Sequence, residues 1–81
     1  MVTVRLGAEQ RRALELLANI PFGGTERLLL ARGFSRRMLL GLVRQGLVTL
    51  TYERALARGE IIEVGKVEIT AAGRNALAAK G

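Results

Sequence analysis

The sequence predicts an α+β fold in a single domain of residues 1–81: a three-helix helix-turn-helix core, then a β-hairpin and a short C-terminal helix. Two observations predict this order. Apolar residues recur every three or four positions before Gly46 and alternate with polar residues after it. Glycines and helix-capping residues separate these segments. Because the chain has 81 residues and only 4% aromatics, we expect one small core of Leu, Ile, Val and Ala.

Three helices are predicted in the N-terminal half, each with a cap before it and a breaker after it. Val2, Val4 and Leu6 precede them and alternate with polar residues, which is typical of a short strand. Pro21 ends the first helix because the residue before a proline avoids the helical region. Glycines end the other two helices as left-handed terminators. The predicted helices are residues 8–19 after Gly7, 26–32 after Thr25 and 36–45 after Ser35.

The C-terminal half is predicted to form a hairpin and a last helix. The hairpin has strands at residues 47–52 and 61–70 and a charged loop at 53–60. The apolar positions of the second strand change parity, so we expect a bulge at Gly65-Lys66. Thr70 then caps an Ala-rich helix over residues 71–79.

The residue types that are missing exclude most catalytic chemistry. The chain has no Cys, His, Trp or Asp, so it lacks a thiolate nucleophile, an imidazole base and the usual zinc or haem ligands. We therefore expect no enzyme, no catalytic residue, no metal, no cofactor and no small-molecule substrate. The absence of Cys fits a reducing, cytoplasmic location. The longest uncharged run, residues 16–25, is too short to span a membrane, which needs about 20 apolar residues.

Positive charge is concentrated in the first half of the chain. The net charge is +6; residues 1–46 hold eight basic and three acidic residues, 8 − 3 = +5, and the rest hold +1. Most of the cations are Arg, which suits phosphate oxygens and guanine edges. Abundant Arg, Ala, Gly and Leu also follow from a GC-rich genome, so both explanations stay open at this point.

Two passages resemble winged helix domains. Residues 42–48, LVRQGLV, are similar to the passage from the recognition helix into the first wing strand, and residues 69–77, ITAAGRNAL, are similar to the passage from the wing into the last helix of MarR-like bacterial regulators. The third helix is about a turn shorter than in those regulators, and their long dimerisation helices have no counterpart. The resemblance implies a bare winged helix domain that binds duplex DNA, with the third helix in the major groove and loop 53–60 as the wing.

The predicted DNA-contacting residues lie on the third helix and in the wing loop. Helical spacing turns Met38, Leu39, Leu42 and Val43 inward and leaves an outward stripe at i, i+3, i+4 and i+7. In the major groove that stripe would reach phosphates, base edges and thymine methyl groups. The predicted contacts are Arg36, Arg37, Leu40, Gly41, Arg44 and Gln45 on the helix, and Arg54 and Arg58 in the loop.

The sequence also supports a different partner. An outward Leu40 suits a protein interface, and the stripe lacks Asn, Ser or Thr for reading bases. Leu28, Leu29 and Leu30 point in three directions, so we expect a homodimer or a protein partner to cover some of them. The sequence therefore predicts a small bacterial DNA-binding protein, a transcriptional regulator or nucleoid-associated factor. The alternative is a protein-interaction module, or an RNA binder, that uses the exposed leucines.

Overall fold

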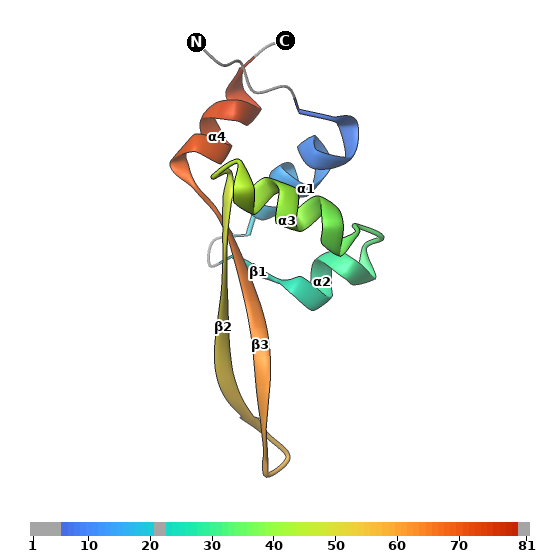
Figure 1. Cartoon of the computed structure of the whole chain (residues 1–81), viewed down its shortest axis with the longest axis vertical. Coiled ribbons are helices and arrows are strands. Elements are labelled where there is room, and N and C mark those ends of the chain that lie inside the picture. The colour runs from blue at the N-terminus through green and yellow to red at the C-terminus, as the bar shows by residue number, and fades with distance from the viewer. Residues whose placement is uncertain (1–5, 21–22, 80–81) are drawn as a thin grey trace.

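The computed structural model describes residues 6–20 and 23–79 and confirms an α+β architecture (Figure 1). Three antiparallel strands form one sheet in the order β1-β3-β2, and the body of helices lies at one end of a long hairpin. None of the described helices is long and apolar enough to cross a membrane. The elements are α1 (Ala8–Ala18), β1 (Gly24–Thr25), α2 (Glu26–Ala31), α3 (Arg36–Arg44), β2 (Val48–Ala57), β3 (Glu60–Ile69) and α4 (Ala71–Ala78).

All four predicted residues occupy the N-cap positions of their helices, and three of them cap with their side chains. The side-chain oxygens of Thr25, Ser35 and Thr70 each accept a hydrogen bond from the backbone three residues on, at 3.0, 3.1 and 3.0 Å. At α1, where Gly7 offers no side chain, the Gln10 side chain accepts from the Gly7 amide at 3.1 Å. The strand predicted around Val2 and Val4 lies outside the described residues, as does Pro21.

The core lies between the helices and the base of the hairpin. Leu39 and Leu42 of α3 are buried, and Met38 and Val43 are half-buried against them, which confirms the predicted inward face of that helix. No polar or charged residue is buried among the described residues. The buried hydrophobic residues are Ala13, Leu14, Leu17, Leu29, Leu39, Leu42, Leu47, Val48 and Val67.

The predicted loop at residues 53–60 and the predicted bulge were both wrong. The strands pair without interruption from Val48 opposite Ile69 to Ala57 opposite Glu60, so only Arg58 and Gly59 remain as the turn. Their φ angles are 52° and 80°, as a two-residue type I′ turn requires, and this turn lets the ladder run to the tip. Because no bulge restores the parity, the apolar side chains of β3 change from one face of the hairpin to the other.

Thr70 and Gly73 join α4 to the end of α3 and the start of β2. The Thr70 hydroxyl donates to the Gly46 carbonyl at 2.7 Å, and the Thr70 amide donates to the Leu47 carbonyl at 3.0 Å. Gly73 is buried directly against that Leu47 carbonyl, and a Cβ there would overlap it and lie 2.7 Å from Ile69 Cγ1. A residue with a Cβ does not fit at position 73, because α4 lies directly against the backbone of Leu47 there.

This close approach predicts opposite effects for two glycine substitutions. Gly73→Ala should lower the free energy of unfolding by about 1–3 kcal/mol, because backbone cannot move aside as a flexible side chain can. Gly41→Ala, inside α3 with no atom within 4 Å of the added Cβ, should raise it by about 0.5–1 kcal/mol. Urea unfolding followed by circular dichroism measures both, and a neutral Gly73→Ala would contradict the packing described.

Candidate nucleic-acid interface

The outward stripe predicted on α3 is present in the structure. Arg37, Leu40 and Arg44 are exposed, whereas the opposite face of the helix supplies Leu39 and Leu42 to the core. A Cβ at Gly41 would meet no atom within 4 Å, so the helix backbone is open to close approach there. Gln45 is also exposed and forms the C-cap of α3. The structure thus brings together five of the six residues predicted on this helix.

Two arginines of the stripe have no counter-ion in the part of the chain that the structure describes. Among the described residues, no carboxylate lies within 4.0 Å of Arg37 or Arg44. Arg37 lies in the first turn of α3, which holds no acid, and the helix dipole makes a cation unfavourable at that end. Interactions within the helix therefore do not explain an arginine at position 37. A phosphate group brought to this face would form a charge-assisted contact with Arg37.

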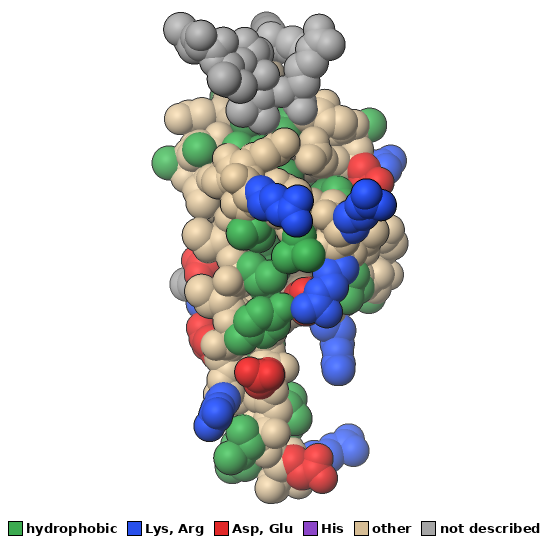
Figure 2. All heavy atoms as spheres, viewed as in Figure 1, with side chains coloured by type: hydrophobic (Ala, Val, Ile, Leu, Met, Phe, Trp, Pro, Cys, Tyr) green, Lys and Arg blue, Asp and Glu red, His purple; other side chains and the backbone are tan. Residues whose placement is uncertain are grey.

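Further cations and apolar side chains are exposed outside the stripe. Arg27 of α2 and Arg32, the C-cap of that helix, are both exposed. On the face drawn in Figure 2, basic side chains flank a group of hydrophobic ones over the helical body, and charges of both signs follow the hairpin. Leu40 is 39% exposed within this surface. The face can therefore contact both an anion and an apolar group such as a methyl.

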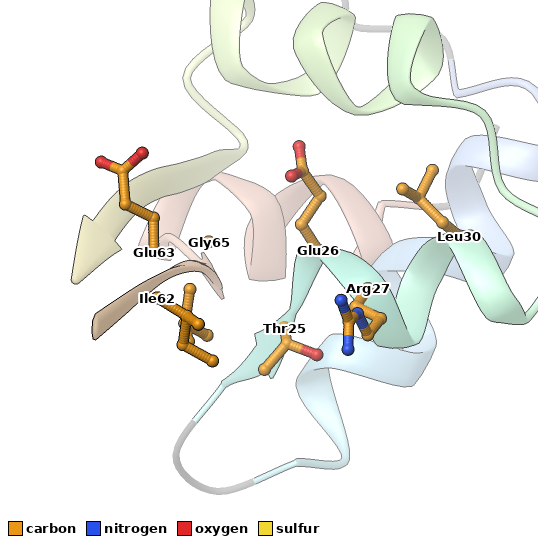
Figure 3. Close-up of a pocket in the computed structure, with 8 residues that line it drawn as sticks. Thr25, Glu26, Arg27, Leu30, Ile62, Glu63 and Gly65 are labelled. Atoms are coloured by element: carbon orange, nitrogen blue, oxygen red, sulfur yellow. The ribbon is translucent and has the colours of Figure 1, made fainter. Parts of the chain in front are cut away.

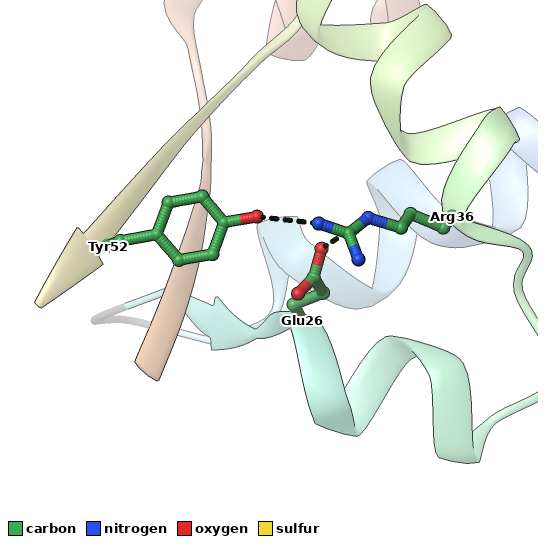
Figure 4. Close-up of polar contacts among 3 residues, drawn as sticks. All are labelled: Glu26, Arg36 and Tyr52. Atoms are coloured by element: carbon green, nitrogen blue, oxygen red, sulfur yellow. Dashed lines mark hydrogen bonds and ion pairs between the residues drawn. The ribbon is translucent and has the colours of Figure 1, made fainter. Parts of the chain in front are cut away.

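Arg36 differs from the other predicted contacts because it is bound within the protein. Its guanidinium lies between two side chains (Figure 4): Nη2 donates to the Tyr52 hydroxyl at 3.1 Å, and Nε lies 3.6 Å from Glu26 Oε2. The Glu26 side chain is only 15% exposed, and its Oε2 is buried without a hydrogen-bond partner among the described residues. Arg36 therefore joins α3 to α2 and to the hairpin, a role that its predicted position beside the stripe did not indicate.

The other members of this contact pack over a glycine of β3. Tyr52 lies opposite Gly65 in the strand pairing. A Cβ at Gly65 would lie 3.1 Å from the Glu26 Cβ and 3.2 Å from a ring carbon of Tyr52. Because Gly65 has no side chain, Glu26 of α2 and the Tyr52 ring can pack closely against β3 at this point. We name Glu26, Arg36 and Tyr52 the clamp, because their contacts connect α2, α3 and the hairpin.

The predicted contacts on the hairpin lie in different surroundings from those expected. Arg54 belongs to β2 and is directly opposite Glu63 of β3, while Arg58 forms the turn. Residues 53–63 hold two Arg and three Glu, 2 − 3 = −1, so the outer hairpin has a small negative charge. The hairpin does not extend the basic face of α2 and α3.

A cleft between α2 and β3 was missed in the sequence. It has a volume of about 400 Å³ (Figure 3). Arg27 and Leu30 reach it from α2, and Ile62, Glu63 and Val64 from β3. Its lining residues are far apart in the sequence, and their proximity depends on the long hairpin, which no local pattern predicts. Among the described residues, no group of three or more metal-ligating side chains occurs here or elsewhere.

Comparisons with protein-family models, with curated proteins and with solved structures found no match to this chain. The functional assignment therefore depends on the site itself.

The turn geometry predicts that Arg58 can be replaced with a gain in stability. A non-glycine residue at φ 52° is strained, and Asn-Gly is the preferred type I′ pair. Arg58→Asn should raise the free energy of unfolding by about 0.5 kcal/mol, because Asn tolerates the left-handed region better than Arg. Arg58→Ala is the control, since it removes the same charge without relieving the backbone. Equal unfolding midpoints in urea for the two variants would contradict this account of the turn.

Proposed function

We propose that the protein is a small bacterial winged helix protein that binds duplex DNA, as a transcriptional regulator or nucleoid-associated factor. The observation that supports this most directly is the exposed face of α3 with two arginines that have no counter-ion within residues 6–20 and 23–79. The order α1-β1-α2-α3-β2-β3-α4 agrees with the winged helix resemblance of the sequence. In this assignment α2 and α3 form the helix-turn-helix, and the β2–β3 hairpin is the wing.

The proposed mechanism places α3 in the major groove. A helix with its side chains is about 10–12 Å across and the groove is about 12 Å wide, so the exposed face can enter. Arg37 and Arg44 are seven residues apart, about 10 Å along the axis, and reach separate phosphates or guanine edges. Gly41 allows the backbone to approach the bases, and Leu40 contacts a thymine methyl.

Most of the affinity comes from phosphate contacts of α2 and α3. Arg27 of α2 and Arg32 at its C-cap are also exposed and can add phosphate contacts. The hairpin, with its charge of −1 over residues 53–63, adds little electrostatic attraction. Arg36 contributes as a positioning residue, since its Nη2 donates to Tyr52 and its Nε lies beside the Glu26 carboxylate. Gln45 is the one amide side chain of the face, so sequence discrimination is modest.

A protein-interaction function is the second candidate, and a specific observation favours it. Leu56 is 75% exposed and Ile61 is 70% exposed, and both lie at the far end of the hairpin. Apolar groups at this exposure are typical of surfaces that contact other proteins. This surface is separate from α3, so the two functions are compatible within one molecule.

Salt dependence tests the DNA-binding proposal. For about six phosphate contacts, affinity for duplex DNA should fall about 1,000-fold between about 50 and 200 mM salt, because bound counterions are released. The double variant Arg37→Ala and Arg44→Ala should weaken binding and lower the slope of log K against log salt by about 2. Fluorescence anisotropy with a labelled random-sequence duplex measures both quantities.

The matched control is the double variant Arg12→Ala and Arg74→Ala. These exposed arginines belong to α1 and α4, so the control removes the same charge from outside the proposed interface. Its salt slope should remain that of the unmodified protein. Equal losses in the two double variants would show that net charge, and not the α3 face, determines binding. No binding to any duplex at low salt would exclude the function.

A further inference from the structure

The outer half of the hairpin exposes apolar side chains on both of its faces. No residue between Thr49 and Val64 has a buried side chain. Leu56 and Ile61 lie opposite each other on one face, and Ala55 and Ile62 lie opposite each other on the other. A two-stranded ribbon alone in water is marginally stable, and a third strand or a packed face normally supports it. The outer hairpin therefore has apolar side chains suited to packing, but no third strand or packed face covers them among the described residues.

The outer edge of β3 is open along the same segment. Among the described residues, β1 pairs with β3 only at Lys66 and Val67, so no strand lies beside residues 60–65 on that side. The cleft against α2 follows this open edge, with Leu30, Ile62 and Val64 in its lining. The cleft is only partly apolar, since Thr25, Glu26, Arg27 and Glu63 also line it. An open strand edge beside such a cleft is the arrangement to which an added strand binds.

Charge favours a second copy of this chain as the occupant. Residues 53–63 carry −1, so the remainder of the chain carries +6 − (−1) = +7. A nucleic acid would be repelled by this segment, and two copies approaching through their helical bodies would repel each other. Contact through the outer hairpins avoids that repulsion and brings the slightly negative tip of one copy close to the positive body of the other.

We propose that two copies associate by antiparallel pairing of residues 60–64 of β3, about a two-fold axis near Ile62. The tip lies at one end of this segment and the cleft at the other, so antiparallel pairing places each tip beside the partner's cleft. The contact is self-complementary, as a two-fold dimer requires. Pairing about Ile62 sets Glu60 of one copy diagonal to Lys66 of the other, within reach of an ion pair. One arrangement thus pairs the open edge and brings the tip of each copy to the partner's cleft.

Single cysteines test this geometry cleanly, because the chain contains no Cys. Residues opposite each other in antiparallel strands have Cα atoms about 4.5–5.5 Å apart, within the range of a disulfide. Ile62→Cys should therefore form a disulfide-linked dimer on mild oxidation, at least about tenfold faster than the control Leu40→Cys. The control is matched, since Ile62 is 41% exposed and Leu40 is 39% exposed.

Ala55→Cys separates the two edges of the hairpin. Ala55 lies opposite Ile62 on β2, so in the proposed dimer its two copies would be three strand spacings apart, about 14 Å, and should not link. Rapid linking of Ala55→Cys, or of Leu40→Cys, would place the contact elsewhere and overturn the proposal.

Sedimentation of the unmodified chain gives the second measurement. It should show a dimer at high micromolar concentration. The variant Ile62→Lys should be a monomer with an unchanged circular dichroism spectrum, because it would set two lysines directly opposite each other at the two-fold axis and Ile62 is 41% exposed in the single chain. A monomeric unmodified chain, with slow linking at residue 62, would overturn the proposal and leave the edge to a strand of another protein. Both measurements are made without DNA, so neither result depends on the proposed DNA-binding function.

Discussion

The close approach of α4 to the Leu47 carbonyl is the constraint on which the rest of the structure depends. Gly73 permits it, and the Thr70 hydroxyl and amide connect the same point to Gly46 and Leu47. The end of α3, the start of β2 and the end of β3 therefore meet within a few residues of one another. Because this junction fixes where α3 ends and where the hairpin begins, it sets the relative direction of the α3 face and the hairpin, the two proposed interaction surfaces.

Local patterns were enough to predict the helices, their caps and the inward face of α3, because these features depend on neighbours three or four residues apart. They failed at the hairpin, where Glu53, Arg54 and Glu60 suggested a solvated loop. A charged side chain does not prevent strand pairing when both faces are open to solvent, and the Arg58-Gly59 turn was short enough to continue the ladder. From Ile62 to Val64 the apolar residues of β3 lie on even positions, and from Val67 they lie on odd positions. This pattern predicted a bulge, but the uninterrupted pairing shows that the apolar side chains change from one face of the hairpin to the other.

The stripe on α3 was predictable for the same reason as its inward face, but the role of Arg36 was not. Its partners Glu26 and Tyr52 are brought to it by α2 and β2, and neither lies at helical spacing from it. The charge distribution shows a similar limit. The sequence shows a basic N-terminal half and a nearly neutral C-terminal half. It does not show that residues 53–63, with a net charge of −1, form the outer part of a hairpin that projects away from the helices.

Glu26 connects the two proposed surfaces. Its carboxylate belongs to the clamp that holds the hairpin against α3, and the same residue lines the cleft beside the open edge of β3. A strand bound in that cleft would exclude more water from Glu26 and strengthen its attraction to Arg36, since charges interact more strongly away from solvent. Changing Glu26 would therefore alter both surfaces together. Arg37 and Ile62 each lie on one surface and outside the clamp, and so only substitutions at positions of that kind can distinguish DNA contact from self-association.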